Sequence, residues 1–222
     1  MLKYKYDKVV TGGDFMPTQT YLNLPKEKQD RIFNAAVDEF SVRTFNEAKI
    51  SNIIKSAEIA RGSFYQYFDD KKDLLLYLFD IIGNQKIEYF GEDILNNINN
   101  IPFTTLFREL YKAGIMFALE HPKYVALMKN VIASKDDHLR EMLQASKHKA
   151  IELYSFLIDK DKKEYKIRDD IDTVTLAQFV YDITINIATD QFHGEEVLDL
   201  NKMYEKADMI MSIFEKGVTK VD

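Results

Sequence analysis

The chain has 222 residues, no cysteine and a formal net charge of −6. This length allows one large or two small domains with a sizeable core, and the lack of cysteine excludes disulfides, thiolate zinc sites and cysteine nucleophiles. The charge is uneven, because residues 1–72 carry 12 lysines and arginines against 10 acidic residues, whereas residues 73–222 carry 18 against 26. The two parts are therefore expected to have different partners.

The sequence gives no sign of export or of insertion into a membrane. The N-terminus contains lysines but lacks the apolar segment of a signal peptide. No run approaches the roughly 18 apolar residues that a membrane-spanning helix needs. We expect a soluble, cytoplasmic protein without a membrane partner.

Apolar residues recur at helical spacing along most of the chain, and this pattern predicts an all-α protein. Residues 1–22 show no clear period and are expected to form an N-terminal arm, followed by a small helical domain over 23–72 and a larger one over 73–222. Helices are predicted over 26–41, 48–57 and 60–66, from Lys71 onward, and over 102–120, 122–134, 137–159, 171–192 and 198–217. We also expect Asp69 or Asp70 to cap the helix that begins at Lys71, and a charged loop from Asp159 to Asp170.

The two short helices within 48–66 have the proportions of a helix-turn-helix unit. The residues expected to point inward from the second helix are Ile59, Phe64 and Phe68, and those expected to point outward are Arg61, Gly62, Ser63, Tyr65, Gln66 and Tyr67. Hydroxyls and backbone N–H groups bind phosphates, arginine reads guanine, and glycine lets a backbone approach closely. Lys71 and Lys72 begin the next helix, where N–H groups without partners would attract a further phosphate. The pattern predicts a DNA-binding surface.

The stretch ISNIIKSAEIARGSFYQYFDDKKDL, from Ile50 to Leu74, resembles the DNA-binding signature of the tetracycline-repressor (TetR) family of bacterial regulators. The resemblance covers about residues 26–75. It implies an N-terminal three-helix DNA-binding domain and a larger C-terminal helical domain that binds an effector and forms a dimer. The DNA contacts that it implies are Lys49, Ser51, Arg61, Gly62, Ser63, Tyr65, Gln66, Tyr67 and Lys71.

The sequence departs from the family pattern at three positions. Lys49 stands where the family usually has a threonine or serine cap, and Ala60 replaces a common serine cap of the second short helix. Glu58 replaces the usual glycine of the turn, which predicts either a right-handed turn or a strained one.

The larger domain is rich in phenylalanine, tyrosine and methionine at helical spacings, and most of these side chains are expected to form plain core. Their number is also compatible with an apolar cavity among the helices at 102–120, 122–134, 137–159 and 171–192. We expect a largely apolar small-molecule effector with one or two polar groups. Its expected contacts are Tyr111, Phe117, Tyr124, Met128 and Phe179.

The helices predicted over 171–192 and 198–217 carry apolar residues on more than one face, which predicts that they form a homodimer interface. The residues concerned are Leu176, Phe179, Val180, Ile183 and Ile187 in the first helix and Met203, Ala207, Ile210, Met211 and Phe214 in the second.

The leading hypothesis is a homodimeric regulator, most simply a repressor, that binds a palindromic double-stranded operator and releases it when the effector binds. A second hypothesis is a DNA-binding protein of the same fold that a protein partner controls without a small molecule. A third is a helical enzyme, but the sequence has no glycine-rich phosphate loop, nucleophile elbow or HExxH motif. We therefore expect no catalytic residue, no cofactor and no metal site.

Overall fold

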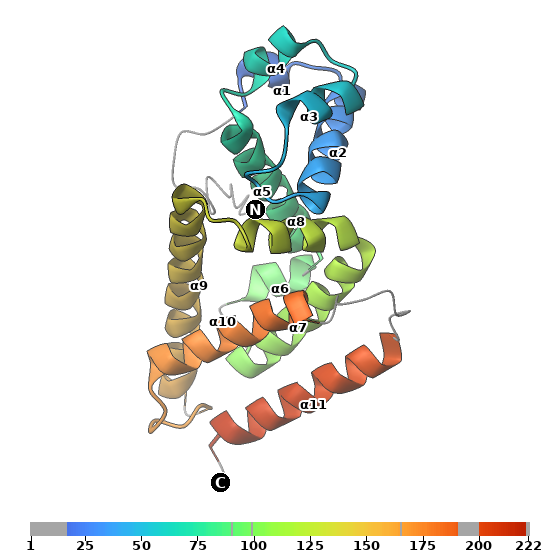
Figure 1. The fold of residues 1–222 in the computed structure, drawn as a ribbon. Coiled ribbons are helices and arrows are strands. Elements are labelled where there is room, and N and C mark those ends of the chain that lie inside the picture. The colour runs from blue at the N-terminus through green and yellow to red at the C-terminus, as the bar shows by residue number, and fades with distance from the viewer. Residues whose placement is uncertain (1–16, 90, 99, 165, 191–199, 221–222) are drawn as a thin grey trace. The chain divides into compact units, whose positions relative to one another are not determined.

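The structure is a computed structural model that describes residues 17–89, 91–98, 100–164, 166–190 and 200–220. Regular structure in these ranges is helical, as Figure 1 shows, which confirms the all-α prediction. The helices are α1 (Gln19–Leu22), α2 (Lys26–Val42), α3 (Ile50–Ser56), α4 (Arg61–Tyr67), α5 (Lys71–Glu88), α6 (Glu92–Asn97), α7 (Phe103–Glu120), α8 (Pro122–Ile132), α9 (Asp137–Lys163), α10 (Thr173–Asp190) and α11 (Leu200–Val218).

The chain forms two compact units that are divided differently from the two domains expected from the sequence. The first unit contains residues 1–85 and 121–146, and the second contains residues 86–120 and 147–222. Helix α8 and the start of α9 therefore belong with the helix-turn-helix segment, although the sequence placed them in the larger domain. This division arises because the apolar stripe of α2 packs along α8 as well as along α3.

The core of the first unit is built on the inward face of α2. Ile32, Ala36 and Phe40 recur at a spacing of four residues and are buried, and Leu127 and Val131 of α8 are buried in the same unit. At the C-terminal end of α2, the side-chain amide of Asn130 donates hydrogen bonds to the carbonyl oxygens of Phe40 (3.0 Å) and Ser41 (2.9 Å). These carbonyls have no partner within the helix, so α8 completes the end of α2.

The core of the second unit is dominated by aromatic rings. Phe107 of α7 lies edge-on to Tyr111 at 6.2 Å and to Phe214 of α11 at 5.1 Å. Arg108, one residue further along α7, donates to both carboxylate oxygens of Glu215 at 3.2 and 2.5 Å. The bidentate pair fixes α7 against α11 beside the ring cluster.

Helix α9 runs four residues beyond its predicted end, to Lys163, through part of the stretch expected to be a charged loop. In the sequence, the run of charged residues indicates a loop. In the structure, three lysines lie in the last turn of α9, where they stabilise the negative end of the helix dipole. Asp161 turns inward and is buried, and its Oδ2 accepts the backbone N–H of Phe103 at 2.5 Å. This carboxylate therefore caps the start of α7.

The helices α1 and α6 are further differences from the sequence prediction. Helix α1 lies in the segment expected to form the N-terminal arm, and only residues 17–22 of that segment fall within the described ranges. Among the helices described, none combines the length and the apolar character needed to cross a bilayer.

Candidate nucleic-acid interface

Helix α4 has one buried face and one exposed polar face. Phe64 and Phe68 are fully buried, as the sequence predicted. The exposed side chains along the opposite face are those of Arg61, Tyr65 and Gln66, together with the backbone at Gly62. Because the buried rings anchor the helix in the first unit, the polar face is presented to solvent.

The expectation that Tyr67 points outward is wrong, since only 3% of this residue is exposed. Residue 67 follows Phe64 by three positions, so both rings fall on the same face of the helix. The Tyr67 ring lies edge-on to Tyr21 at 5.9 Å, and the Lys28 amine lies 5.6 Å from its centre. Tyr67 therefore holds the end of α4 in place and is not available for DNA.

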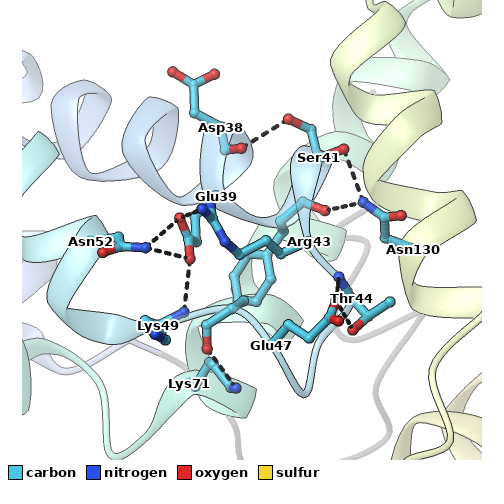
Figure 2. A network of polar contacts seen from close by, with 12 residues as sticks. Asp38, Glu39, Ser41, Arg43, Thr44, Glu47, Lys49, Asn52, Lys71 and Asn130 are labelled. Atoms are coloured by element: carbon cyan, nitrogen blue, oxygen red, sulfur yellow. Dashed lines mark hydrogen bonds and ion pairs between the residues drawn. The ribbon is translucent and has the colours of Figure 1, made fainter.

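Glu39 of α2 caps helix α3 from outside. Lys49 is the N-cap residue of α3 and its side chain makes no capping hydrogen bond. Its backbone N–H instead donates to Glu39 Oε1 at 2.8 Å, and the Asn52 amide donates to both Glu39 oxygens at 3.0 and 3.1 Å, as Figure 2 shows. Arg43 pairs with the same carboxylate at 2.9 Å. The cap that Lys49 cannot supply is thus replaced by a buried, fully bonded glutamate.

Lys71 does not present a free amine to DNA, which corrects its predicted role. Its Nζ donates to the carbonyl oxygens of Phe45 (2.5 Å) and Ala48 (2.8 Å) and lies 4.6 Å from the centre of the Phe45 ring. Figure 2 shows this amine against the loop that leads into α3. Burial lowers the pKa of Lys71. The residue therefore fixes the loop that carries Lys49.

The start of α5 also differs from the phosphate site expected there. Asp70 Oδ1 accepts the N–H of Asp73 at 2.8 Å, and Asp73 Oδ2 accepts the N–H of Asp69 at 3.1 Å. Asp70 therefore acts as the N-cap of α5, so the prediction that an aspartate caps this helix is confirmed. The N–H groups involved already have carboxylate acceptors, and the negative charge disfavours a phosphate.

The turn between α3 and α4 contains a strained residue. Glu58 has a φ of 54°, in the left-handed region, which settles the choice between a right-handed and a strained turn. A side chain in this conformation costs roughly 1–2 kcal/mol. Ala60 is the N-cap of α4 and offers no side-chain acceptor, as its identity implies. Glu58 and Ala60, the two departures from the family pattern, therefore do little to stabilise the N-terminal end of α4.

Three cations remain available on the helix-turn-helix surface. Lys49, Lys55 and Arg61 are exposed, and in the part of the chain that the structure describes none of them forms an ion pair. The cations on α2 differ, because Lys26 pairs with Asp30 at 2.7 Å. The sequence analysis missed Lys55, although it lies four residues after Ser51 and thus on the same face of α3.

The backbone at Gly62 is open to close approach. A Cβ added at Gly62 would meet no other atom within 4 Å, so glycine is not required there by packing within the chain. Ser51 is exposed and Ser63 is half-buried near the starts of their helices. The surface therefore combines free cations, hydroxyls and an unobstructed stretch of backbone, which are the groups that contact phosphates and base edges.

The residues expected to bind an effector are not brought together in one unit. Tyr111, Phe117 and Phe179 belong to the second unit, whereas Tyr124 and Met128 belong to the first. Tyr124 donates to Gln85 Oε1 at 3.1 Å and lies edge-on to Phe33, so it has a packing role in the first unit. Phe179 is more than half exposed on α10.

Within the second unit, Tyr111 is buried and its Oη has no hydrogen-bond partner among the described residues. Burial raises its pKa to about 12. Phe117 is buried against Tyr89. No group of three or more histidine or carboxylate side chains that could hold a metal occurs in the described ranges.

Comparison with known sequences agrees with the geometry of α3 and α4. Residues 32–78 match the family model for bacterial regulatory proteins of the tetR family. A fatty acid metabolism regulator protein of Bacillus subtilis is 36% identical over 69 residues, which are 31% of this chain and 36% of that protein. The chain covers only 27% and 36% of the lengths of the first two curated relatives.

Solved structures extend the likeness to nearly the whole chain. A TetR family transcriptional regulator from Chloroflexus aurantiacus has a TM-score of 0.70 at 25% identity, over 93% of this chain and 100% of that one. The transcriptional regulator FadR from Bacillus subtilis, solved in complex with stearoyl-CoA, has a TM-score of 0.71 at 17% identity, over 85% of this chain and 98% of that one. The helix-turn-helix geometry and the match over residues 32–78 show that this chain carries the DNA-binding domain of the tetR family of bacterial regulatory proteins, on a fold that it shares with TetR family transcriptional regulators.

Proposed function

We propose that this protein is a transcriptional repressor that places α4 in the major groove of a palindromic operator and releases the DNA when a small molecule binds. The observation that carries the proposal is the division of α4 into a buried aromatic face and an exposed face of unpaired polar groups. Arg61 suits bidentate contact with guanine, and Gln66 suits contact with adenine. Lys49, Ser51 and Lys55 on α3 suit the flanking phosphates.

A homodimer would present two copies of α4 to two half-sites one helical turn apart. Exposed apolar residues on α10 and α11 support this arrangement. On α11, Met209 and Ile213 are 66% and 68% exposed and follow one another by four positions, while Met211 and Phe214 are buried on the other side. On α10, Phe179 is exposed in the same way. Three residues expected in this interface, Ile187, Met203 and Ala207, lie outside the described side chains.

A test of the dimer face uses sedimentation at micromolar concentration. Ile213→Lys should convert a dimer to a monomer, because a buried lysine at a symmetric contact lacks an acceptor. Val42→Lys is the matched control, since Val42 is equally exposed but lies at the end of α2 in the first unit. A wild-type chain that sediments as a monomer would contradict the proposal.

We propose that the effector is a largely apolar molecule with one or two polar groups and that it binds in the second unit. The Tyr111 hydroxyl, which has no partner among the described residues, supports this, because a ligand oxygen would supply the missing hydrogen-bond acceptor. The Tyr111 ring packs on Phe107, which in turn packs on Phe214. Phe117 is a second proposed contact. Fatty acid regulators among the relatives make long acyl chains the first class to examine, with stearoyl-CoA as the probe.

The deciding experiment is selection of binding sites from random duplexes with the purified full chain, followed by titration of the selected DNA with and without stearoyl-CoA. We expect a palindromic site whose affinity falls by about 5- to 150-fold with the probe, whereas coenzyme A alone leaves the affinity unchanged. Failure to select any sequence would reject the repressor. Selection without release by any apolar probe would favour control by a protein partner.

A further inference from the structure

Helix α1 completes the C-terminal end of α4 from outside the segment that defines the family. The family match begins at residue 32, whereas Thr18 lies just before α1. The Thr18 backbone N–H donates to the carbonyl oxygen of Tyr67 at 3.0 Å, and its Oγ1 donates to the carbonyl oxygen of Gln66 at 2.5 Å. The last carbonyls of a helix have no partner within it. One residue therefore satisfies two of them.

Thr18 is itself held in position. Its Oγ1 also accepts the N–H of Tyr21 at 3.4 Å, so the hydroxyl caps α1 while it donates to α4. Tyr21 is fully buried, and its ring contacts Phe68 at 4.8 Å and Tyr77 of α5 at 5.2 Å. The Gln29 amide, from α2, donates to the carbonyl oxygen of Leu24 at 2.9 Å. The segment 17–24 is thus fixed to α2, α4 and α5.

Helix α4 depends on such outside contacts because it is short. It has seven residues, and a helix of this length is marginal without tertiary support. Its N-cap residue, Ala60, has no side-chain acceptor, so support at the other end matters more. The carbonyl that Thr18 Oγ1 contacts belongs to Gln66, whose exposed side chain is one of the proposed base readers.

We infer that Thr18 is a positioning residue for operator recognition, which acts by fixing the backbone of Gln66 at the end of α4. The inference rests on the proposed function in one respect, that α4 is the helix that reads the operator. Loss of the Thr18 hydroxyl frees the last turn of α4, so that the Gln66 side chain meets its base in a wider range of positions. Contacts with phosphates, which tolerate such variation, remain.

The test compares three single variants of the full chain. Thr18→Val removes the hydroxyl and keeps the shape, Thr18→Ser keeps the hydroxyl, and Thr20→Val makes the same chemical change at an exposed position of α1. For each variant we would measure affinity for the selected operator, affinity for a random duplex, and the Tm. Operators substituted at single base pairs then report which position each variant still reads.

We expect Thr18→Val to bind the operator about fivefold more weakly and to bind the random duplex as the wild type does. Its penalty for substitution should shrink at one base pair of each half-site, and both Thr18→Ser and Thr20→Val should behave as the wild type. If Thr18→Val lowers the Tm but leaves operator affinity and base preference unchanged, Thr18 only caps α1 and the inference is wrong. If the wild type selects no operator at all, the proposed function itself fails, and the two failures are distinguishable.

Discussion

The two units of this protein treat their buried polar groups in opposite ways. In the described part of the first unit, the buried side chains of Glu39, Asp73 and Ser134 all have hydrogen-bond partners. In the second unit, Tyr111 Oη, Ser155 Oγ and Asp161 Oδ1 are buried and have none among the described residues.

The same contrast between the units holds for two lysines, Lys71 and Lys86, whose pKa is lowered by burial. In the first unit, Lys71 donates to two carbonyls and lies over a ring. In the second, Lys86 has no such partner among the described side chains.

This difference in hydrogen bonding suits the different partner that we propose for each unit. Recognition of base edges in a DNA groove needs helices held in a defined geometry. The first unit provides this through closed networks such as the one in Figure 2. A buried group without a partner lowers stability by about 1–3 kcal/mol. Such groups fit a unit that receives polar atoms from a bound molecule.

The largest effect should follow from opening the closed network at Glu39. Glu39→Ala leaves the Lys49 N–H, the Asn52 amide and Arg43 without their shared acceptor. We expect the free energy of unfolding to fall by about 3 kcal/mol, as measured by urea denaturation. Glu47→Ala is the control, because Glu47 is exposed and bonds only Thr44 in the same loop. If Glu39→Ala lowers the free energy of unfolding no more than Glu47→Ala does, the hydrogen bonds of Glu39 do not stabilise the fold as we expect.

The second effect concerns the surface that the first unit presents. Arg61→Ala should weaken operator binding by about 1–3 kcal/mol and relax preference at one base pair per half-site. Stability should not change, because Arg61 makes no ion pair among the described residues. Titration of matched and substituted operators measures this, with Lys26→Ala on α2 as the control. An equal loss on every sequence would assign Arg61 to a phosphate.

The third effect compares the two units directly through two tyrosines. Tyr111→Phe removes a buried hydroxyl without a partner and should raise the free energy of unfolding by about 1 kcal/mol. Tyr124→Phe, in the first unit, removes a hydroxyl that donates to Gln85 and should lower it by about 1 kcal/mol.

We therefore predict that the two variants change the free energy of unfolding in opposite directions, as measured by urea denaturation. A loss of stability in both variants would show that Tyr111 already has a partner, and the contrast between the units would disappear. If stearoyl-CoA is the effector, Tyr111→Phe should also weaken its binding.

Sequence patterns predicted what depends on local periodicity. The bounds of α2 and α7, the buried positions of Phe64 and Phe68, and the cap at Asp70 follow from spacing and capping chemistry. Contacts between distant segments could not be predicted in this way. Lys71 looked like a phosphate contact because its partners, the carbonyls of Phe45 and Ala48, lie more than 20 residues earlier.

The same limit explains the other differences. Helix α1 is too short to show a period, and it is formed because Tyr21 fits among the rings of α4 and α5. The placement of α8 in the first unit depends on Asn130 and the apolar stripe of α2, which no local pattern in α8 reveals.

A substitution at Gly62 should separate the stability of the fold from its affinity for DNA. Gly62 lies inside α4, where alanine is favoured over glycine by roughly 0.5–1 kcal/mol, and an added Cβ meets no atom within 4 Å. Gly62→Ala should therefore make the free protein slightly more stable.

The added methyl group nevertheless projects from the face that we propose lies against DNA. We expect operator affinity to fall while urea denaturation shows a small gain in stability. Gly217→Ala is the matched control, because it is also an exposed glycine inside a helix with open space around it, but it lies near the end of α11 in the second unit. Undiminished operator binding by Gly62→Ala would place the backbone of α4 away from the duplex, and the contacts proposed for Arg61 and Gln66 would then need a different docking geometry.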